Sequence, residues 1–275
     1  MISMTANALN HKNYSRSKQN ITGLNTKSAL MKDIYNKALE LAALGGNIII
    51  VGETGSGKKH LGRLIHQNSS RKEGPFHWFY CIDINESDYK DAFWEHIQIM
   101  DSHIILTYDA IEKASYGFLF LDQFCELDES FMIDIIKSFQ QGCSQLFRYN
   151  ISAAPRLILS IDQNAYKNIL QKDIWKTLLD LTESNVIMLP PLRERKEDIP
   201  ELIELFLDEI RVKNNEWRDI ALTEEAFNRC YNYNWPGNIL QLKNALLQGA
   251  MVSTNDLIDV QHLPISLKWS LPYTP

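Results

Sequence analysis

Eight consecutive residues have the types and spacing of a phosphate-binding loop. They are Gly52, Glu53, Thr54, Gly55, Ser56, Gly57, Lys58 and Lys59. Glycines in such a loop let backbone N–H groups turn toward a phosphate, and the ammonium of Lys58 can reach the outer phosphates of a nucleotide. The strict pattern ends in Ser or Thr, whose hydroxyl binds Mg²⁺, whereas this chain has Lys59. The segment predicts nucleotide binding, with a glycine-rich structural turn as the alternative.

A second candidate is the carboxylate of Asp122, which follows the apolar run 118–121. Ligands of parallel sheets bind at the carboxyl ends of the strands, so Asp122 is the predicted ligand of Mg²⁺ or of its bound water. The next residue usually positions the attacking water in P-loop ATPases, and here it is Gln123. A neutral amide can hold a water molecule but cannot accept its proton. The pair favours binding over hydrolysis, although an Asp at a strand end can also be structural.

Short apolar runs alternate with helical patterns over the first two thirds of the chain. The runs, each predicted to be a buried strand, are 47–51, 77–82, 118–121, 157–161 and 186–189. Strands that alternate with helices predict an α/β fold with a parallel sheet. The glycine-rich segment would then join a strand to a helix, which is the context that a P-loop requires.

The pattern changes at the two prolines 190–191. Beyond them it is helical, including 199–207 and 239–251, which predicts a small helical lid domain. We therefore expect three parts, which are a flexible tail over 1–20, a P-loop α/β core over 21–191, and the lid with a C-terminal tail over 192–275.

Composition narrows the classes of protein that fit. The 275 residues carry a net charge of −6, with 45% hydrophobic and 23% charged residues, which is typical of a folded chain rather than a disordered one. No apolar run approaches the roughly 20 residues that cross a bilayer, and no signal peptide is recognisable. We expect a cytoplasmic protein without membrane contact. The cysteines lie too far apart for a paired zinc or redox motif, and we expect buried free thiols.

Several ordered motifs make the chain resemble the AAA+ domain of bacterial sigma-54 activators, also called enhancer-binding proteins. The likeness extends from about residue 21 to residue 264. Its anchors are the P-loop, 66–71, 75–76, 120–122, 189–195 with 198–199, and 234–238 with 242–244. The resemblance implies a three-layer P-loop core with a helical lid, and ATP or ADP with Mg²⁺ as ligands. It also implies ring assembly, by self-association or with an AAA+ relative, and contact with the sigma-54 subunit of RNA polymerase.

The resemblance also identifies positions at which this chain departs from the family. The catalytic Glu is replaced by Gln123 and the Asn that switches it by Tyr80, which removes water activation. The Asn of the sensor I strand is replaced by Asp162. Added negative charge at that position should disfavour the terminal phosphate of ATP.

The family's arginine fingers and sensor II are also changed. Gln171 and Thr177 stand at the two finger positions, and Leu240 stands at the sensor II Arg. Lys172 and Lys176 lie nearby, but an ammonium does not replace a bidentate guanidinium. Because one arginine finger is worth about 10³–10⁵ in rate, these departures predict a degenerate member with little or no ATP hydrolysis.

Other positions bear on partners. The GAFTGA loop, which contacts sigma-54 in the family, falls near 98–103 and is absent there. Arg193 and Arg195 belong to a charged run that would by default be solvated, whereas in the family it lies near the nucleotide and the lid junction. Trp78, Trp94 and Trp235 are predicted to pack in the core. No DNA-binding domain is expected after the lid.

Three hypotheses of function follow. The leading one is a nucleotide-binding AAA+ module of sigma-54-activator type that regulates transcription through protein contacts, with little or no ATP hydrolysis. The second is an active ATPase that activates sigma-54-dependent transcription. The third is an interaction scaffold that binds no nucleotide.

Overall fold

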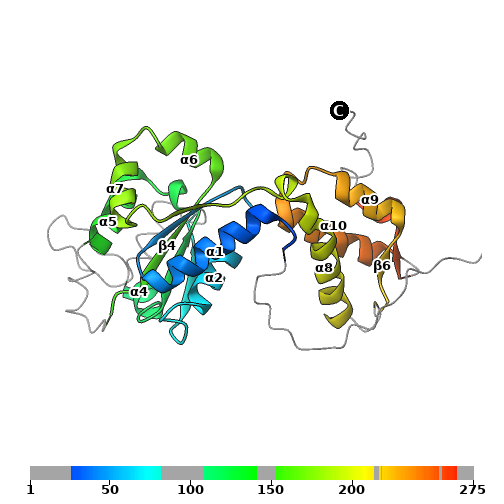
Figure 1. Ribbon diagram of the computed structural model, residues 1–275, viewed down its shortest axis with the longest axis horizontal. Helices are drawn as coiled ribbons and strands as arrows, with labels where there is room; N and C mark the ends of the chain where they lie inside the picture. Colours follow the sequence, from blue (N-terminus) through cyan, green and yellow to red (C-terminus); the bar gives the residue numbers. More distant parts are fainter. Residues whose placement is uncertain are drawn as a thin grey trace, which may run out of the picture.

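A computed structural model describes residues 26–81, 108–140, 153–213, 217, 219–253 and 256–264. Its elements form two lobes that lie side by side, a sheet covered by helices and a smaller, mostly helical lobe (Figure 1). We call the first lobe the core and the second the lid. The N-terminal end of helix α1 points toward the junction between them (Figure 1).

A parallel sheet of five strands, in the order β2-β3-β4-β1-β5, forms the centre of the core. The strands are β1 Ile48–Val51, β2 Phe76–Tyr80, β3 Phe118–Asp122, β4 Arg156–Ile161 and β5 Val186–Met188. This confirms the predicted α/β fold and the position of every predicted strand. The bounds of each strand differ from the predicted run by one or two residues.

Helices cover both faces of the sheet. They are α1 Ala29–Leu44, α2 Lys58–Gln67, α4 Tyr108–Lys113, α5 Glu129–Gln140, α6 Gln163–Ile169, α7 Asp173–Leu181 and the 3-10 turn η1 Phe124–Glu126. Alternate residues of β1 face opposite layers, as a strand requires. Ile48 and Ile50 pack with α1 and α2, whereas Ile49 and Val51 pack with α5 and α7. Every β1 side chain is fully buried, which explains the unbroken apolar run.

A buried arginine in β4 ties the sheet to the end of α1. The guanidinium of Arg156 donates to the carbonyl oxygens of Leu41 at 2.6 Å, Ala42 at 3.2 Å and Gly46. The carbonyls of Leu41 and Ala42 belong to the last turn of α1, where the helix dipole favours a cation, and Gly46 follows the helix. Burial lowers the pKa of Arg156 to about 10.

The lid packs around its own apolar cluster. Its elements are η3 Leu192–Glu194, η4 Lys196–Asp198, α8 Ile199–Lys213, β6 Ala221–Leu222, α9 Glu224–Asn232, α10 Asn238–Val252, β7 Leu257–Ile258 and η6 Val260–His262. Trp235 is fully buried there and donates from its indole to the carbonyl of Cys230 at 2.8 Å, so its predicted core position is confirmed. The small parallel pair β6 and β7 is an addition to the predicted helical pattern.

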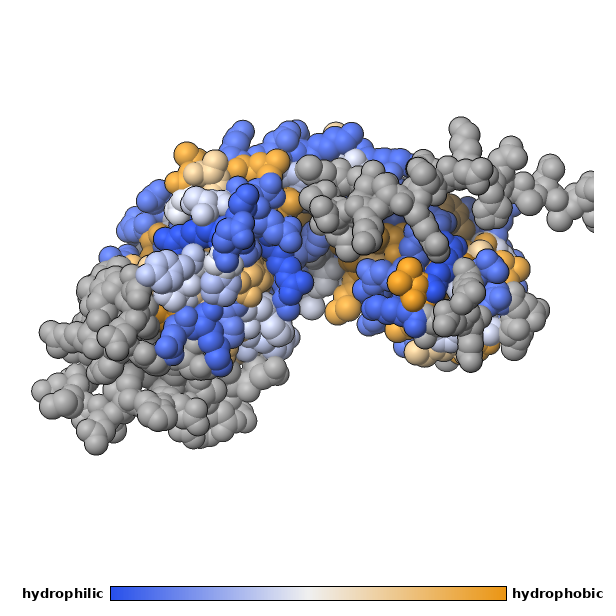
Figure 2. Space-filling model, turned by 90° about the horizontal axis from the view of Figure 1, so that it is seen from below, coloured by the Kyte–Doolittle hydropathy of each residue, from blue (hydrophilic) through white to orange (hydrophobic). Residues whose placement is uncertain are grey.

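The surface, the hydropathy of the helices and the cysteines of the described residues relate to the composition. Seen from below, the coloured surface is mostly hydrophilic, with separate hydrophobic patches on both lobes and a notch between them (Figure 2). Within the described ranges, no helix has both the length and the hydropathy needed to cross a membrane. Cys81 and Cys230 are buried and Cys125 is half-buried, and all three are free thiols. Cys143 lies outside the described residues.

Candidate nucleotide site

The P-loop joins the carboxyl end of β1 to the first turn of α2, as predicted. Its conformation depends on glycine at two positions, because Gly55 has φ +75° and Gly57 has φ +105°. Helix α2 begins at Lys58, and the N–H groups of a first helical turn have no acceptor within the helix. Such a terminus favours anions. The loop therefore presents the backbone geometry of a phosphate site.

The ammonium of Lys58 lies across this loop. It is buried and donates to the carbonyl oxygens of Gly52 at 2.7 Å and Glu53 at 3.1 Å. Burial lowers the pKa of Lys58, and the negative charges of Asp122, Asp162 and Glu53 oppose that shift. Because the Lys58 ammonium already lies on the carbonyls of the P-loop, it can reach a phosphate bound in the loop by a small rotation of its side chain.

The interior of the loop also contains a polar atom without a protein partner. The hydroxyl of Ser56 is buried and makes no hydrogen bond, a state that costs free energy unless a ligand or water satisfies it. It lies against Gly52, where a Cβ would come within 3.0 Å of the Ser56 oxygen and 2.9 Å of the Leu189 carbonyl. The loop thus fits the phosphates of a nucleotide, and a side chain at position 52 would fill it.

A chain of hydrogen bonds connects the P-loop with the ends of β3 and β4. The Gln123 amide donates to the Thr54 hydroxyl at 3.2 Å, and that hydroxyl lies 3.5 Å from a carboxylate oxygen of Asp162. Gln123 is buried and has a positive φ of 58°, so its backbone is held in an unfavourable conformation. The other oxygen of Asp162 caps α6 by accepting from the Asn164 N–H. Positions predicted from separate motifs therefore meet at one place.

Asp122 is engaged by two side chains. One carboxylate oxygen accepts a hydrogen bond from the Ser160 hydroxyl, and the other accepts from the Trp78 indole at 3.2 Å. The ammonium of Lys59 lies 3.4 Å from the centroid of the Trp78 ring, and Tyr80 stacks on the same indole with centroids 5.8 Å apart. Within the described segments, no cluster of three or more His, Cys, Asp and Glu side chains could hold a metal ion.

The predicted core position of Trp78 is wrong, because this side chain is 39% exposed. It lies on β2, which forms an edge of the sheet and has one neighbouring strand. Its ring contacts the Lys59 ammonium and stacks on Tyr80 instead of packing in the core. Trp94 lies outside the described residues.

The lid contacts the P-loop directly. The Arg193 guanidinium binds the Glu53 carboxylate through two hydrogen bonds, of 2.8 and 2.6 Å. Asn238 donates to the same carboxylate at 3.1 Å and to the Thr54 carbonyl at 3.0 Å. Buried Arg195 donates to the Ser56 carbonyl at 2.6 Å. Both arginines of the charged run therefore contact the loop instead of forming a solvated face.

The remaining predicted positions are more scattered. Leu240 follows the contact between the Ile239 N–H and the Gly55 carbonyl, and it is 54% exposed beside the loop. Gln171 is exposed in the turn between α6 and α7, whereas the hydroxyl of Thr177 donates back to the Asp173 carbonyl within α7. Lys172 forms a salt bridge with Glu129 of α5 at 3.0 Å. Residues 98–103 lie outside the described residues.

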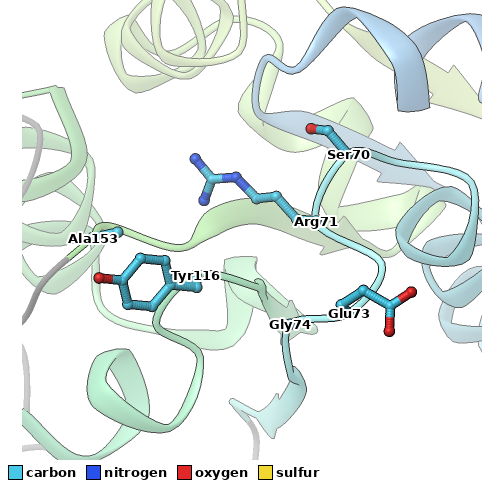
Figure 3. A pocket seen from close by; sticks show the side chains of 6 residues that line it. All are labelled: Ser70, Arg71, Glu73, Gly74, Tyr116 and Ala153. Atoms are coloured by element: carbon cyan, nitrogen blue, oxygen red, sulfur yellow. The ribbon is translucent and has the colours of Figure 1, made fainter.

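A cavity of about 440 Å³ lies at the amino ends of β2, β3 and β4. It is lined by Ser70, Arg71, Glu73, Gly74, Tyr116 and Ala153, which precede β2, β3 and β4 (Figure 3). Arg71 extends toward Ala153 and donates to the Ala154 carbonyl at 2.7 Å (Figure 3). Ligands of parallel sheets bind at the carboxyl ends of the strands, so this cavity is separate from the nucleotide site.

Sequence reasoning missed three contributors, which are Trp78, Ser160 and Asn238. Ser160 could have been recognised from the sequence, because it is the polar residue in the apolar run 157–161. Asn238 is buried with φ 53°, a conformation that Asn tolerates better than most residues. The role of Trp78 depends on the pairing of β2 with β3, which the sequence does not specify.

Comparison with known proteins identifies the family. The model of the sigma-54 interaction domain matches residues 24–182, and that of the AAA+ ATPase lid domain matches residues 193–273. The Nif-specific regulatory protein of Herbaspirillum seropedicae is 28% identical over 88% of this chain and 45% of its own length. The transcriptional regulatory protein XylR of Pseudomonas putida is 30% identical over 82% of this chain and 41% of its own length.

Solved structures agree on the fold. The crystal structure of NtrX from Brucella abortus in complex with ATP covers 89% of this chain and 57% of its own, with a TM-score of 0.72 and 22% identity. The ADP complex of the same protein has a TM-score of 0.70. The chain spans about half the length of the curated relatives it matches. With its P-loop core and adjoining lid, the chain belongs to the sigma-54 interaction domain family of AAA+ proteins.

Proposed function

We propose that this chain is a nucleotide-binding AAA+ module of the sigma-54-activator type, which regulates transcription through protein contacts and hydrolyses little or no ATP. The observation that carries the proposal is the bond from the Gln123 amide to the Thr54 hydroxyl at 3.2 Å. The residue that follows Asp122 therefore has a neutral side chain, and that side chain is hydrogen-bonded to the P-loop.

Nucleotide binding is supported by the P-loop itself. Lys58 is buried on the loop carbonyls, Ser56 has an unsatisfied hydroxyl, and the loop leads into the N-terminus of α2. These are the features that bind phosphates in P-loop proteins. NtrX of Brucella abortus, which shares the fold, has been crystallised with ATP and with ADP.

Weak hydrolysis follows from the side chain of Gln123 and from the residues at the family's arginine positions. Hydrolysis is accelerated by a group that positions water and accepts its proton, and an amide cannot accept a proton. Gln171, Thr177 and Leu240 are neutral where the family has arginines, so charge that develops on the terminal phosphate would lack those guanidinium groups. Loss of a single finger costs about 10³–10⁵ in rate. We therefore propose that the bound nucleotide controls the conformation of the chain and is not turned over.

The proposed partners are AAA+ chains and the transcription machinery. A competent relative could supply the missing arginines in a mixed ring, or this chain could associate with itself. The sigma-54 subunit of RNA polymerase is the further partner that the family suggests. These contacts would occur in the cytoplasm.

The experiment is a titration of the purified protein with a fluorescent ATP analogue, followed by an assay of phosphate release. We expect saturable binding that Lys58→Ala abolishes and that Lys32→Ala, which removes an exposed lysine of α1, leaves intact. Phosphate release should not exceed that of Lys58→Ala. Sustained turnover that depends on Lys58 would instead establish an active ATPase.

A second candidate is the scaffold that binds no nucleotide. It is favoured by the two hydrogen bonds from Lys58 to the carbonyls of Gly52 and Glu53, because the loop satisfies its own lysine. Absence of binding at saturating analogue, with the fold intact by circular dichroism, would select this candidate.

A further inference from the structure

Mg²⁺ accompanies the nucleotide in P-loop ATPases, where it is held through the P-loop hydroxyl and a carboxylate at a strand end. In this chain the two ligands do not fit that role. Position 59 holds an ammonium instead of a hydroxyl. Asp122 has a donor on each oxygen, the Ser160 hydroxyl on one and the Trp78 indole on the other. Each donor occupies one of the two lone pairs on its oxygen, so Asp122 offers fewer free ligand sites to Mg²⁺, which requires oxygen ligands at about 2.0–2.1 Å in near-octahedral geometry.

Lys59 is held in the same group of side chains. Its ammonium lies 3.4 Å from the centroid of the Trp78 ring, while the edge of that ring donates to Asp122 at 3.2 Å. The indole thus connects the cation with the carboxylate. A contact of this kind attracts a lysine ammonium to the ring face.

The charges near Lys59 also act against a divalent cation. Burial and the positive charge of Arg63 lower the pKa of Lys59, whereas Asp122 raises it. A Mg²⁺ ion at Asp122 would be repelled by the same two cations. Lys59 follows Lys58 in the first turn of α2, so it carries positive charge to the end of the P-loop.

We propose that the site binds nucleoside di- or triphosphates without Mg²⁺, with the Lys59 ammonium, held on Trp78, in place of the divalent cation. The inference rests on the proposed nucleotide binding. Lys59 and Trp78 would then determine which form of the nucleotide is bound. That form is the free nucleotide rather than its magnesium complex.

The test is fluorescence anisotropy of a labelled ADP, titrated with the full chain in excess Mg²⁺ and again in excess EDTA. For the unaltered chain we expect binding to be about tenfold or more tighter in EDTA than in excess Mg²⁺, where most of the ADP is the magnesium complex. Lys59→Gln should weaken binding in EDTA by about tenfold or more. Lys32→Gln, which removes an exposed lysine from α1, should have no effect.

Lys59→Thr restores the hydroxyl of the strict pattern and should make binding depend on Mg²⁺. Trp78→Phe keeps a ring for the ammonium and removes the donor to Asp122, so this variant should also gain affinity for the magnesium complex. Thermal unfolding of each variant controls for folding. The comparison on the unaltered chain needs no variant, so it decides the question even if a variant is unstable.

Each outcome decides the proposal. Binding of the unaltered chain that is as tight in Mg²⁺ as in EDTA, or tighter, overturns the inference and leaves the proposed nucleotide binding in place. No binding in either buffer overturns both. Equal affinity of Lys59→Gln and the unaltered chain in EDTA shows that Lys59 does not replace the cation, and overturns the inference as stated.

Discussion

The carboxylate of Glu53, in the P-loop, and the guanidinium of Arg193, in the lid, share two hydrogen bonds of 2.8 and 2.6 Å. The two residues are 140 positions apart in the chain. Bidentate pairing of this kind fixes orientation as well as distance. A phosphate that enters the loop would add negative charge beside Glu53. We therefore expect nucleotide binding and the position of the lid to be coupled through this ion pair.

The first prediction concerns the pH dependence of this pair. The hydrogen bond from Arg193 is the main cause that lowers the pKa of Glu53 below its usual value. Because the folded-state pKa is the lower one, the stabilisation is complete above the unfolded-state pKa and is lost as the pH falls through the folded-state pKa. Glu53→Gln should lower the free energy of unfolding by about 1 kcal/mol at neutral pH, since the pair is partly exposed.

Urea unfolding of both proteins at several pH values measures this difference. The cost should shrink as the pH drops below about 4. Arg193→Gln is the matched variant, and it should give the same dependence because it removes the other half of the pair. A cost that stays constant into acid would show that the ion pair does not stabilise the folded state.

The second prediction compares two glycines of the P-loop. Gly55 and Gly57 both have positive φ, so alanine at either position is strained. A Cβ at Gly55 would also meet the carbonyl of Gly237 in the lid at 2.4 Å, whereas the nearest atom to one at Gly57 is a methyl carbon of Ile239 at 3.6 Å. Gly57→Ala should cost about 1 kcal/mol from backbone strain. Gly55→Ala should cost more and displace the lid.

Limited proteolysis between core and lid separates these effects. We expect faster cleavage near 190–191 in Gly55→Ala than in Gly57→Ala, at a temperature well below the thermal unfolding of both variants. Equal cleavage rates would mean that the lid does not depend on the close approach to Gly55.

The third prediction concerns Asn238. Its side chain accepts from the Leu192 N–H at 2.8 Å and donates to Glu53 and to the Thr54 carbonyl, all in a fully buried position. Asn238→Ala removes a partner from the Leu192 N–H and the Thr54 carbonyl, while Glu53 keeps Arg193, and it places alanine at a positive φ of 53°. The expected loss of stability is about 2–4 kcal/mol. Asn238→Asp keeps the acceptor for Leu192 but faces Glu53 with a second negative charge.

Chemical unfolding monitored by circular dichroism tests both variants. Asn238→Asp should be less stable than wild type at neutral pH and should recover in mild acid, where one carboxylate becomes protonated. Wild-type stability of Asn238→Ala would show that water replaces the lost hydrogen bonds and that the contact is not structural.

The strands, the P-loop and the lid were predictable because local patterns determine them. Apolar runs marked every strand of the sheet, and Gly52 to Lys58 specified a turn that requires glycine. Contacts between distant segments were not predictable in this way. The indole of Trp78 reaches Asp122 because β2 pairs with β3 in register, Tyr80 opposite Asp122. The sequence of neither strand specifies that pairing register.

The same limit applies to the lid. The run that contains Arg193 and Arg195 looks like a solvated face when its charges are counted. In the structure Arg195 is buried, because the chain passes over the P-loop on its way from β5 to α8. Burial of an arginine depends on acceptors from another part of the chain, here the Ser56 carbonyl. Such partners become visible only when the fold brings the segments together.

The last prediction tests a buried cation far from the site. Arg156 donates to three carbonyls at the end of α1, with no carboxylate among these contacts. Arg156→Met keeps much of the side-chain volume and removes the donors, which leaves the carbonyls of Leu41, Ala42 and Gly46 short of a partner. We expect a loss of about 2–4 kcal/mol in the free energy of unfolding. Arg156→Lys should recover only part of it, because an ammonium cannot span three acceptors in the plane of a guanidinium.

Urea denaturation measures the cost, and binding of the fluorescent ATP analogue provides the control. Arg156 is the first residue of β4, so it lies at the opposite end of that strand from the nucleotide site. Binding should therefore be unchanged at temperatures where the variant is folded. If Arg156→Met were as stable as wild type, the apolar contacts of methionine would offset the lost hydrogen bonds, and the helix dipole of α1 would contribute little to holding the arginine.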